Sequence, residues 1–162
     1  MIWFFGFVSA CFAHWWLVQM FPESAAPHLP LMMTIAFSIV RGPVSGQCMG
    51  FFTGLFVDTL SVRLFGGQAL VLSALGYLSG QFRKKIDFNS ALAQALAIFT
   101  ASLAYAAAME ALSLIFMNQT LSGALTYFIG KPLTNALAGP AVFALLDKAA
   151  ASRRRRLLPR AQ

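Results

Sequence analysis

GPVSGQCMGFFTGLFVD, residues 42–58, places a glycine at every fourth position and ends on an acid. A step of four residues advances an α-helix by about 400°, so Gly42, Gly46, Gly50, Gly54 and Asp58 lie almost above one another. In water this glycine row would weaken a helix. In a bilayer, small residues at this spacing let a second backbone approach closely. The stretch therefore predicts a buried packing helix within a membrane, with a carboxylate at its far end.

The composition supports a membrane location. The chain has 162 residues, of which 59% are hydrophobic and 10% charged, and its mean hydropathy is +0.71. Because soluble domains carry about 25% charged residues, this chain cannot cover itself with polar surface. We predict an integral membrane protein with one six-helix transmembrane domain, residues 1–152, and a basic cytoplasmic tail, residues 153–162.

The apolar segments predict an all-α bundle with six transmembrane helices. The second segment is short for an upright span and is predicted to be a short or half-sunk helix. The fourth has a small-residue face, Ala69, Ser73, Gly76 and Gly80, suited to meet the glycine row. The predicted helices are Ile2–Phe21, Leu29–Val40, Gly42–Leu60, Gln68–Phe82, Ala91–Met117 and Pro132–Leu146, the last preceded by an interfacial piece, Leu121–Ile129.

The basic residues predict the orientation. Six spans put both termini on one side, and that side carries ten Lys and Arg residues against two on the other, Arg63 and Lys131. By the positive-inside rule both termini are cytoplasmic, and Asp58 lies near the outer face. Lys131 is expected to snorkel at the boundary. The tail arginines are expected to contact anionic lipid rather than nucleic acid, because no groove-reading module accompanies them.

Few side chains suggest chemistry. A lone intramembrane histidine such as His14 most often hydrogen-bonds a neighbouring helix, whereas His28, in a proline-rich loop, is expected to be solvated. Cys11 and Cys48 are expected to be buried small apolar residues. The sequence has no nucleophile motif, paired acids or metal-ligand spacing. We therefore predict no enzyme activity, no metal and no cofactor.

Asp58 has three open interpretations. It accepts hydrogen bonds from the start of the next helix or from Arg63, it contacts a partner helix, or it forms a proton or solute site. The first of these is favoured because the next helix begins only a short turn later.

Three ordered motifs resemble the rod shape-determining protein MreD family. They are GLFVDTL at 54–60, LFGGQAL at 64–70 and GYLSG at 76–80, and the last predicted helix, 133–146, is also similar to that family's closing helix. The turn at Ser61–Arg63 departs from the family, whose members often have a glycine directly after the acid. The ordered set covers most of the chain.

The resemblance implies a non-enzymatic scaffold of the bacterial inner membrane that supports cell elongation and peptidoglycan synthesis. It implies direct binding of MreC, with the RodA glycosyltransferase, the elongation transpeptidase and MreB in the wider complex. It also implies a fold similar to the substrate-binding components of energy-coupling-factor transporters. The candidate partner or packing residues are Gly46, Gly50, Gly54, Asp58, Gly66, Gly67, Ala69, Gly76, Gly80 and Asn135.

An alternative function follows from the same likeness of fold. The chain has the size and predicted span count of a vitamin-binding subunit of an energy-coupling-factor transporter. Such a subunit needs a polar, aromatic-lined pocket at the outer face, which Asp58, Arg63, His28 and Tyr127 would line. Nothing in the sequence selects a ligand.

Overall fold

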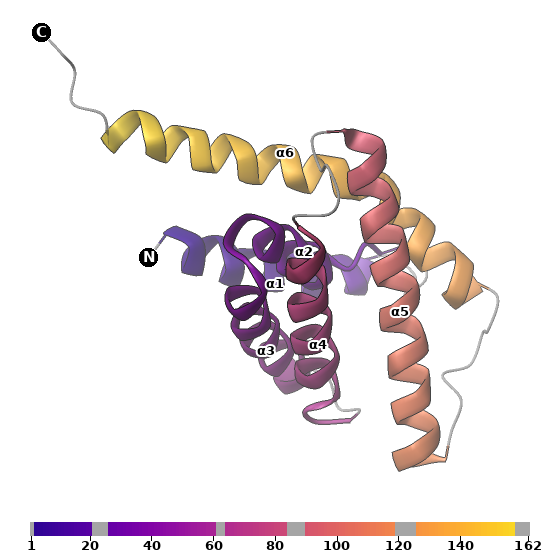
Figure 1. Ribbon diagram of the computed structural model, residues 1–162. Coiled ribbons are helices and arrows are strands. Elements are labelled where there is room, and N and C mark those ends of the chain that lie inside the picture. Colours follow the sequence, from indigo (N-terminus) through magenta and orange to yellow (C-terminus); the bar gives the residue numbers. More distant parts are fainter. Residues whose placement is uncertain (1, 21–25, 61–63, 84–89, 119–125, 158–162) are drawn as a thin grey trace, which may run out of the picture.

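A computed structural model of the chain describes residues 2–20, 26–60, 64–83, 90–118 and 126–157, and these residues are helical almost throughout (Figure 1). Six α-helices and one π-helical turn follow one another along the described residues, in the order that the apolar segments predict. They are α1 (Ile2–Met20), α2 (Leu29–Arg41), α3 (Pro43–Leu60), α4 (Gly67–Phe82), α5 (Ala91–Met117), η1 (Thr126–Gly130) and α6 (Lys131–Leu157).

Helices α3 and α4 form an antiparallel pair in which backbone lies against backbone (Figure 1). A β carbon on Gly50 would lie 2.6 Å from the carbonyl carbon of Leu72, and one on Gly80 would lie 2.5 Å from the Cα of Pro43. A β carbon on Gly54 would overlap the backbone of Ala69. The two small-residue faces therefore meet each other, as the sequence predicts, and dispersion contacts between the backbones hold the pair together.

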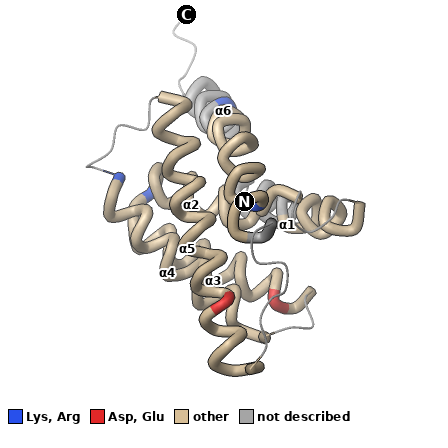
Figure 2. The backbone as a smooth tube through the Cα atoms, turned by 90° about the vertical axis from the view of Figure 1, so that its right-hand side faces the viewer, with Lys and Arg blue, Asp and Glu red and all other residues tan. Residues whose placement is uncertain are grey.

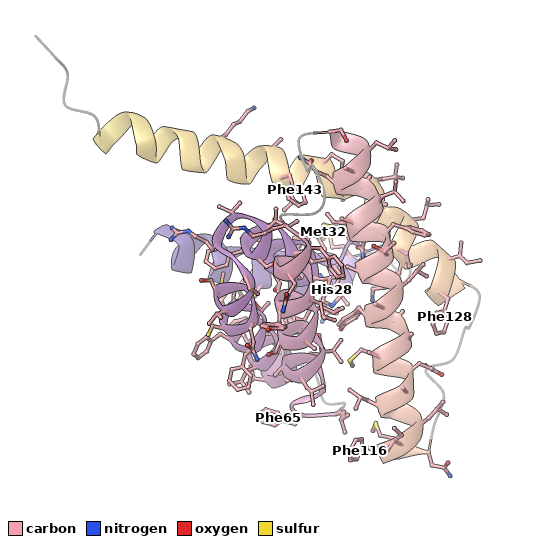
Figure 3. The ribbon with its side chains drawn as sticks, viewed as in Figure 1. His28, Met32, Phe65, Phe116, Phe128 and Phe143 are labelled. Atoms are coloured by element: carbon pink, nitrogen blue, oxygen red, sulfur yellow. The ribbon has the colours of Figure 1, made fainter. Side chains whose placement is uncertain are left out.

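Helix α2 lies at the centre of the bundle, although it has only 13 residues. It packs against each of the other five α-helices. Its Leu31 and Ile35 enter one apolar cluster with Leu72 of α4, and its Met32 enters a second with Phe143 of α6 (Figure 3). The predicted short helix is therefore confirmed by its 13 residues, and its packing makes α2 the helix that the others surround.

Helices α5 and α6 flank this centre (Figure 1). Helix α6 runs on to Leu157, well past the predicted end at Leu146, so the helix continues into the arginine cluster. Pro140 lies inside α6, where the missing amide hydrogen weakens the helix, and the ribbon changes direction along its length (Figure 1).

One of the described helices, α5, is both long and apolar enough by itself to cross a membrane. At 27 residues it is about 40 Å long, enough to span the hydrocarbon core. Helices α2 and α4, with 13 and 16 residues, are shorter than the roughly 20 residues that an upright span needs. Six membrane crossings therefore remain a prediction.

Candidate functional site

Asp58, at the end of α3, caps the beginning of α4. Its Oδ2 accepts hydrogen bonds from the amides of Gly66 and Ala69, each at 3.0 Å, and its Oδ1 accepts one from Gln68 at 3.2 Å. The carboxylate is 1% exposed. A helix N-terminus leaves amide hydrogens without intrahelical partners, and a carboxylate satisfies them and complements the helix dipole. The favoured interpretation of Asp58 is thus confirmed for the helix start, while Arg63 lies outside the described residues.

The turn into α4 depends on a left-handed residue. Gly66 has a φ of +89° and precedes the first residue of α4. A side chain there would meet no atom within 4 Å, so the backbone angle, rather than space, favours glycine. The adjacent Gly67 is buried against the side chain of Leu64. Both glycines therefore shape the Asp58 cap.

A chain of hydrogen bonds joins the start of α2 to α5 and α4 through His28, Tyr105 and Gln68. The Leu31 amide donates to His28 Nδ1, so the imidazole hydrogen is on Nε2 and donates to the Tyr105 hydroxyl at 3.1 Å. That hydroxyl in turn donates to Gln68 Oε1 at 3.0 Å. Since the backbone amide of Gln68 donates to Asp58, the chain ends at the α4 cap.

Asn135 of α6 ties two other helices to the same region. Its Oδ1 accepts from the His28 amide at 2.7 Å, and its Nδ2 donates to the Ser102 hydroxyl of α5 at 2.9 Å. Asn135 is 1% exposed. It therefore serves as an internal link rather than as a surface contact.

A cavity of about 230 Å³ lies at this end of the bundle, which we call the Asp58 end. Residues of α1, α3, α4, α5 and α6 line the cavity, and so does His28, the residue that caps the start of α2. Its polar wall residues include His14, His28, Gln68, Tyr105, Ser113 and Lys131. Apolar groups such as Trp15 and Met109 complete it.

Four predictions about polar residues are corrected by this arrangement. His28, expected in a solvated loop, is buried because the start of α2 lies inside the bundle, and Lys131, expected to snorkel at a boundary, is 8% exposed. Cys48, expected to be buried, is exposed on α3, whereas Cys11 is buried as predicted. His14 Nδ1 donates to the carbonyl of Pro27 at 3.1 Å, so its partner lies in the segment before α2 and not in a neighbouring helix as predicted.

The predicted interface residues divide into two groups. Gly46, Gly50, Gly54, Ala69, Gly76 and Gly80 are buried between α3 and α4 or against α2. Asp58, Gly66, Gly67 and Asn135 belong to the caps and links at the Asp58 end. Of the two roles predicted for these residues, partner contact or packing, the small-residue faces therefore have the packing role, because the chain's own helices fill them.

Sequence reasoning missed Gln68, Tyr105 and Ser102. Polar residues within apolar helices were the available signal, since an intramembrane hydroxyl or amide needs a partner. Their partners lie far away in the chain, so spacing could not pair them. Within the described ranges no group of three or more His, Cys, Asp or Glu residues stands close enough to bind a metal ion.

The family model described as rod shape-determining protein MreD matches residues 1–148. Neither the curated proteins nor the solved structures contain a match to the chain.

Proposed function

Because the chain belongs to the MreD family of rod shape-determining proteins, we propose that it is a non-enzymatic scaffold of the bacterial inner membrane that binds MreC. Proteins of this family are membrane proteins of the rod-shape complex. The match over residues 1–148 is the observation that carries the proposal, because it includes every helix that builds the described bundle except the end of α6.

The proposed topology has six spans and both termini in the cytoplasm. Charge supports it: the basic segments in Figure 2 lie above the acidic ones, which are at the lower end of the bundle. Arg41 is the last residue of α2 and Arg83 follows α4, and both stand at the helix ends that lie opposite the Asp58 end. Positive residues favour the cytoplasmic side, so the Asp58 end is assigned to the outer side.

Cysteine labelling tests this topology. In a background without Cys11 and Cys48, single cysteines replace Ser61, Asn118 and Ser152. A membrane-impermeant thiol reagent added to intact spheroplasts is expected to label the first two and to label Ser152→Cys only after lysis. Labelling of Ser152→Cys in intact spheroplasts would refute the cytoplasmic C-terminus.

A partner helix needs a surface other than the glycine row. Because α4 covers that row, the surface left for MreC is the outward side of the bundle. Large apolar side chains are exposed there on several helices, among them Phe52 of α3, Leu78 of α4 and Ile115 of α5. Lipid or a partner's transmembrane helix can cover such side chains equally well.

Co-purification tests the scaffold proposal. The tagged chain, extracted in mild detergent, is expected to retain MreC. Phe52→Trp, Leu78→Trp and Ile115→Trp add bulk at three separate outward positions while keeping them apolar. At least one of them is expected to lower MreC retention without lowering the melting temperature, which locates the interface. A wild-type chain that retains no MreC would overturn the proposal.

The proposed role in the wider cell-elongation complex rests on the same scaffold proposal. The scaffold would link MreC to the RodA glycosyltransferase, the elongation transpeptidase and MreB, and so support peptidoglycan synthesis along the cell length. The basic residues 153–156 would contact anionic lipid at the cytoplasmic surface. Depletion of the protein is expected to turn rod-shaped cells round, and cells that keep their shape on depletion would contradict this role.

A further inference from the structure

A groove lies between α4 and α5 at the end of the bundle opposite the Asp58 end, which we call the arginine end because Arg83 follows α4 there. One wall belongs to residues 75–82 of α4 and the other to residues 97–104 of α5, while Ile35 and Ile39 of α2 form the floor. Each wall segment is about 10 Å long, and the groove encloses about 210 Å³. No described residue lines both this groove and the cavity at the Asp58 end, so the two are separate.

Small side chains on α5 leave this groove open. Ala97, Ala101 and Ala104 line it with single methyl groups, which do not reach across to α4. On the opposite wall Leu78 is 51% exposed and Phe82 is 48% exposed, so both side chains border the groove without closing it. The groove is therefore accessible from the surroundings of the bundle.

The wall suits an apolar occupant better than water. Its two hydroxyl groups already bond within the chain: Ser79 Oγ bonds to the Ser38 hydroxyl and to the Leu75 carbonyl, each at 2.7 Å, and the Thr100 hydroxyl donates to the Leu96 carbonyl at 3.0 Å. An ordered water needs about two to four polar partners. The remaining wall side chains are apolar, so a hydrocarbon group fits the groove better than a polar one.

The size of the groove matches a hydrocarbon chain and not a helix. One turn of an α-helix, about 10 Å wide and about 5.4 Å long, takes up about 400 Å³, roughly twice the volume of the groove. The groove has room for about seven groups of about 30 Å³, the volume of a water molecule and close to that of a methylene. Its length is also less than one leaflet's share, about 15 Å, of the hydrocarbon core. These dimensions fit part of one lipid acyl chain.

Positive charge lies at the mouth of the groove. Arg83 directly follows Phe82, the wall residue at the end of α4. Its Nη1 would lie 3.0 Å from a β carbon on Gly42, which is about one helical turn beyond Ile39 of the floor. Arg83 is exposed, and the chain continues with two lysines, residues 84–85. The planar guanidinium group matches the geometry of a phosphate.

The acidic side chains that the structure describes lie at the other end of the bundle. Asp58 caps α4 there, and Glu110 is adjacent to Met109 of α5, which lines the cavity at the Asp58 end. Figure 2 shows the acidic segments, in red, at the lower end of the bundle and away from the basic ones. The mouth of the groove is therefore complementary to an anion, and basic sites between transmembrane helices favour anionic lipid head groups.

We propose that the groove between α4 and α5 binds one anionic phospholipid, with an acyl chain along the groove and the phosphate at Arg83. This site is separate from the tail arginines at 153–156, and it goes beyond the scaffold role, which requires no bound lipid. Lipid binding is measured on the purified chain, so its outcome does not depend on MreC or on which side of the membrane the arginine end faces.

A photoreactive lipid tests the proposal. The purified chain in mild detergent is mixed with phosphatidylglycerol that carries a diazirine in one acyl chain, illuminated and digested, and mass spectrometry locates the cross-links. Saturable labelling is expected within 75–82 or 97–104. Unlabelled phosphatidylglycerol is expected to compete at least about fivefold more strongly than phosphatidylcholine with the same acyl chains. Labelling spread evenly over the apolar helices, or equal competition by the two lipids, would overturn the proposal.

Two variants separate the contribution of the head group from that of the acyl chain. Arg83→Gln is expected to reduce the preference for phosphatidylglycerol to about twofold or less, whereas Lys148→Gln, at an exposed position of α6, keeps it. Ala104→Phe fills the groove from an exposed position and is expected to abolish labelling there. Ala111→Phe, also exposed and two turns further along the same face of α5, is not expected to do so. Equal results for variant and control, at wild-type melting temperatures, would refute the site.

A partner's transmembrane helix is the competing occupant of this surface. Saturating MreC is expected to leave the labelling of the groove unchanged, because the groove is smaller than one helical turn. Loss of labelling when MreC is added, together with loss of MreC retention by Ala104→Phe, would assign the groove to the partner and overturn the lipid site. Retention of MreC by the wild-type chain tests the scaffold proposal alone.

Discussion

Asp58 Oδ2 accepts a hydrogen bond from the amide of Ala69 at 3.0 Å, so the last turn of α3 caps the first turn of α4. The same Ala69 lies against Gly54, one helical turn before Asp58 on α3. The cap and the closest backbone approach between the two helices are thus adjacent. The cap therefore depends on the glycine row. A larger side chain at Gly54 would displace α4 and so move the Ala69 amide away from the Asp58 carboxylate.

Replacing Asp58 is expected to destabilise the bundle. The buried carboxylate satisfies three amides, and each hydrogen bond to a charged group contributes about 1.5–3 kcal/mol. Asp58→Ala should therefore cost about 3–5 kcal/mol. Asp58→Asn keeps one acceptor oxygen but turns a donor toward an amide, so it should cost about 1–3 kcal/mol. Thermal unfolding in detergent measures both.

Thr59→Ala is the matched control for this cap. Thr59 is exposed, and its hydroxyl donates to the carbonyl of Phe56 within the same helix, so its loss should change stability by no more than about 0.5 kcal/mol. An Asp58→Ala variant as stable as Thr59→Ala would contradict the capping role.

Gly50→Ala is expected to force α3 and α4 apart. The added β carbon would lie 2.6 Å from the Leu72 carbonyl carbon and closer still to its oxygen, and backbone cannot rotate aside as a side chain can. Overpacking of this kind costs about 1–3 kcal/mol. Ser45→Ala, at an exposed position of the same helix, should be neutral. A melting temperature for Gly50→Ala equal to that of Ser45→Ala would show that the helices do not pack through the glycine row.

The sequence predicted local structure well. The predicted limits of α1, α3 and α4 differ from the observed ones by one residue at most, and those of α5 agree. The hydropathy of a segment predicts where an apolar helix begins and ends, and the glycine spacing along α3 predicts which of its faces packs against a neighbour. Both signals are local, and so is the short turn that brings Asp58 to the start of α4.

Long-range packing was not predictable in the same way. The sequence predicted a short or half-sunk helix at α2, and no local signal indicated that its neighbours surround it. His28 follows a proline-rich stretch that is typical of a solvated loop, and its burial depends on Tyr105, 77 residues later in the chain. Lys131 is buried and lines a cavity with residues of α1 and α5, which lie far from it in the sequence, so its flanking Gly130 and Pro132 do not reveal its burial.

Gly66 offers a test that separates backbone strain from packing. Gly66→Ala meets no neighbouring atom, yet a φ of +89° disfavours any residue with a β carbon, so a loss of about 1–2 kcal/mol is expected. Gly66→Asn should lose less, because asparagine adopts left-handed backbone more readily. Equal melting temperatures for wild type and Gly66→Ala would contradict a left-handed conformation at this turn.

Tyr105→Phe is expected to weaken the link between α5 and the centre of the bundle. Loss of the hydroxyl leaves the Nε2 hydrogen of His28 and the oxygen of Gln68 without their shared partner. Interhelical hydrogen bonds in membrane proteins contribute about 0.6 kcal/mol on average and up to about 1.7, so a loss of about 1–2 kcal/mol is expected. Tyr77→Phe, at an exposed position of α4, should be neutral.

A double-mutant cycle isolates this link from the loss of packing. Gln68→Leu removes the acceptor at the end of the chain of hydrogen bonds, so the variant carrying both changes should lose less stability than the sum of the single losses. A coupling of about 0.5 kcal/mol or more is expected for residues in direct contact. Strict additivity of Tyr105→Phe and Gln68→Leu would mean that the hydroxyl and the carboxamide contribute independently, and that no continuous chain of hydrogen bonds joins His28 to the start of α4.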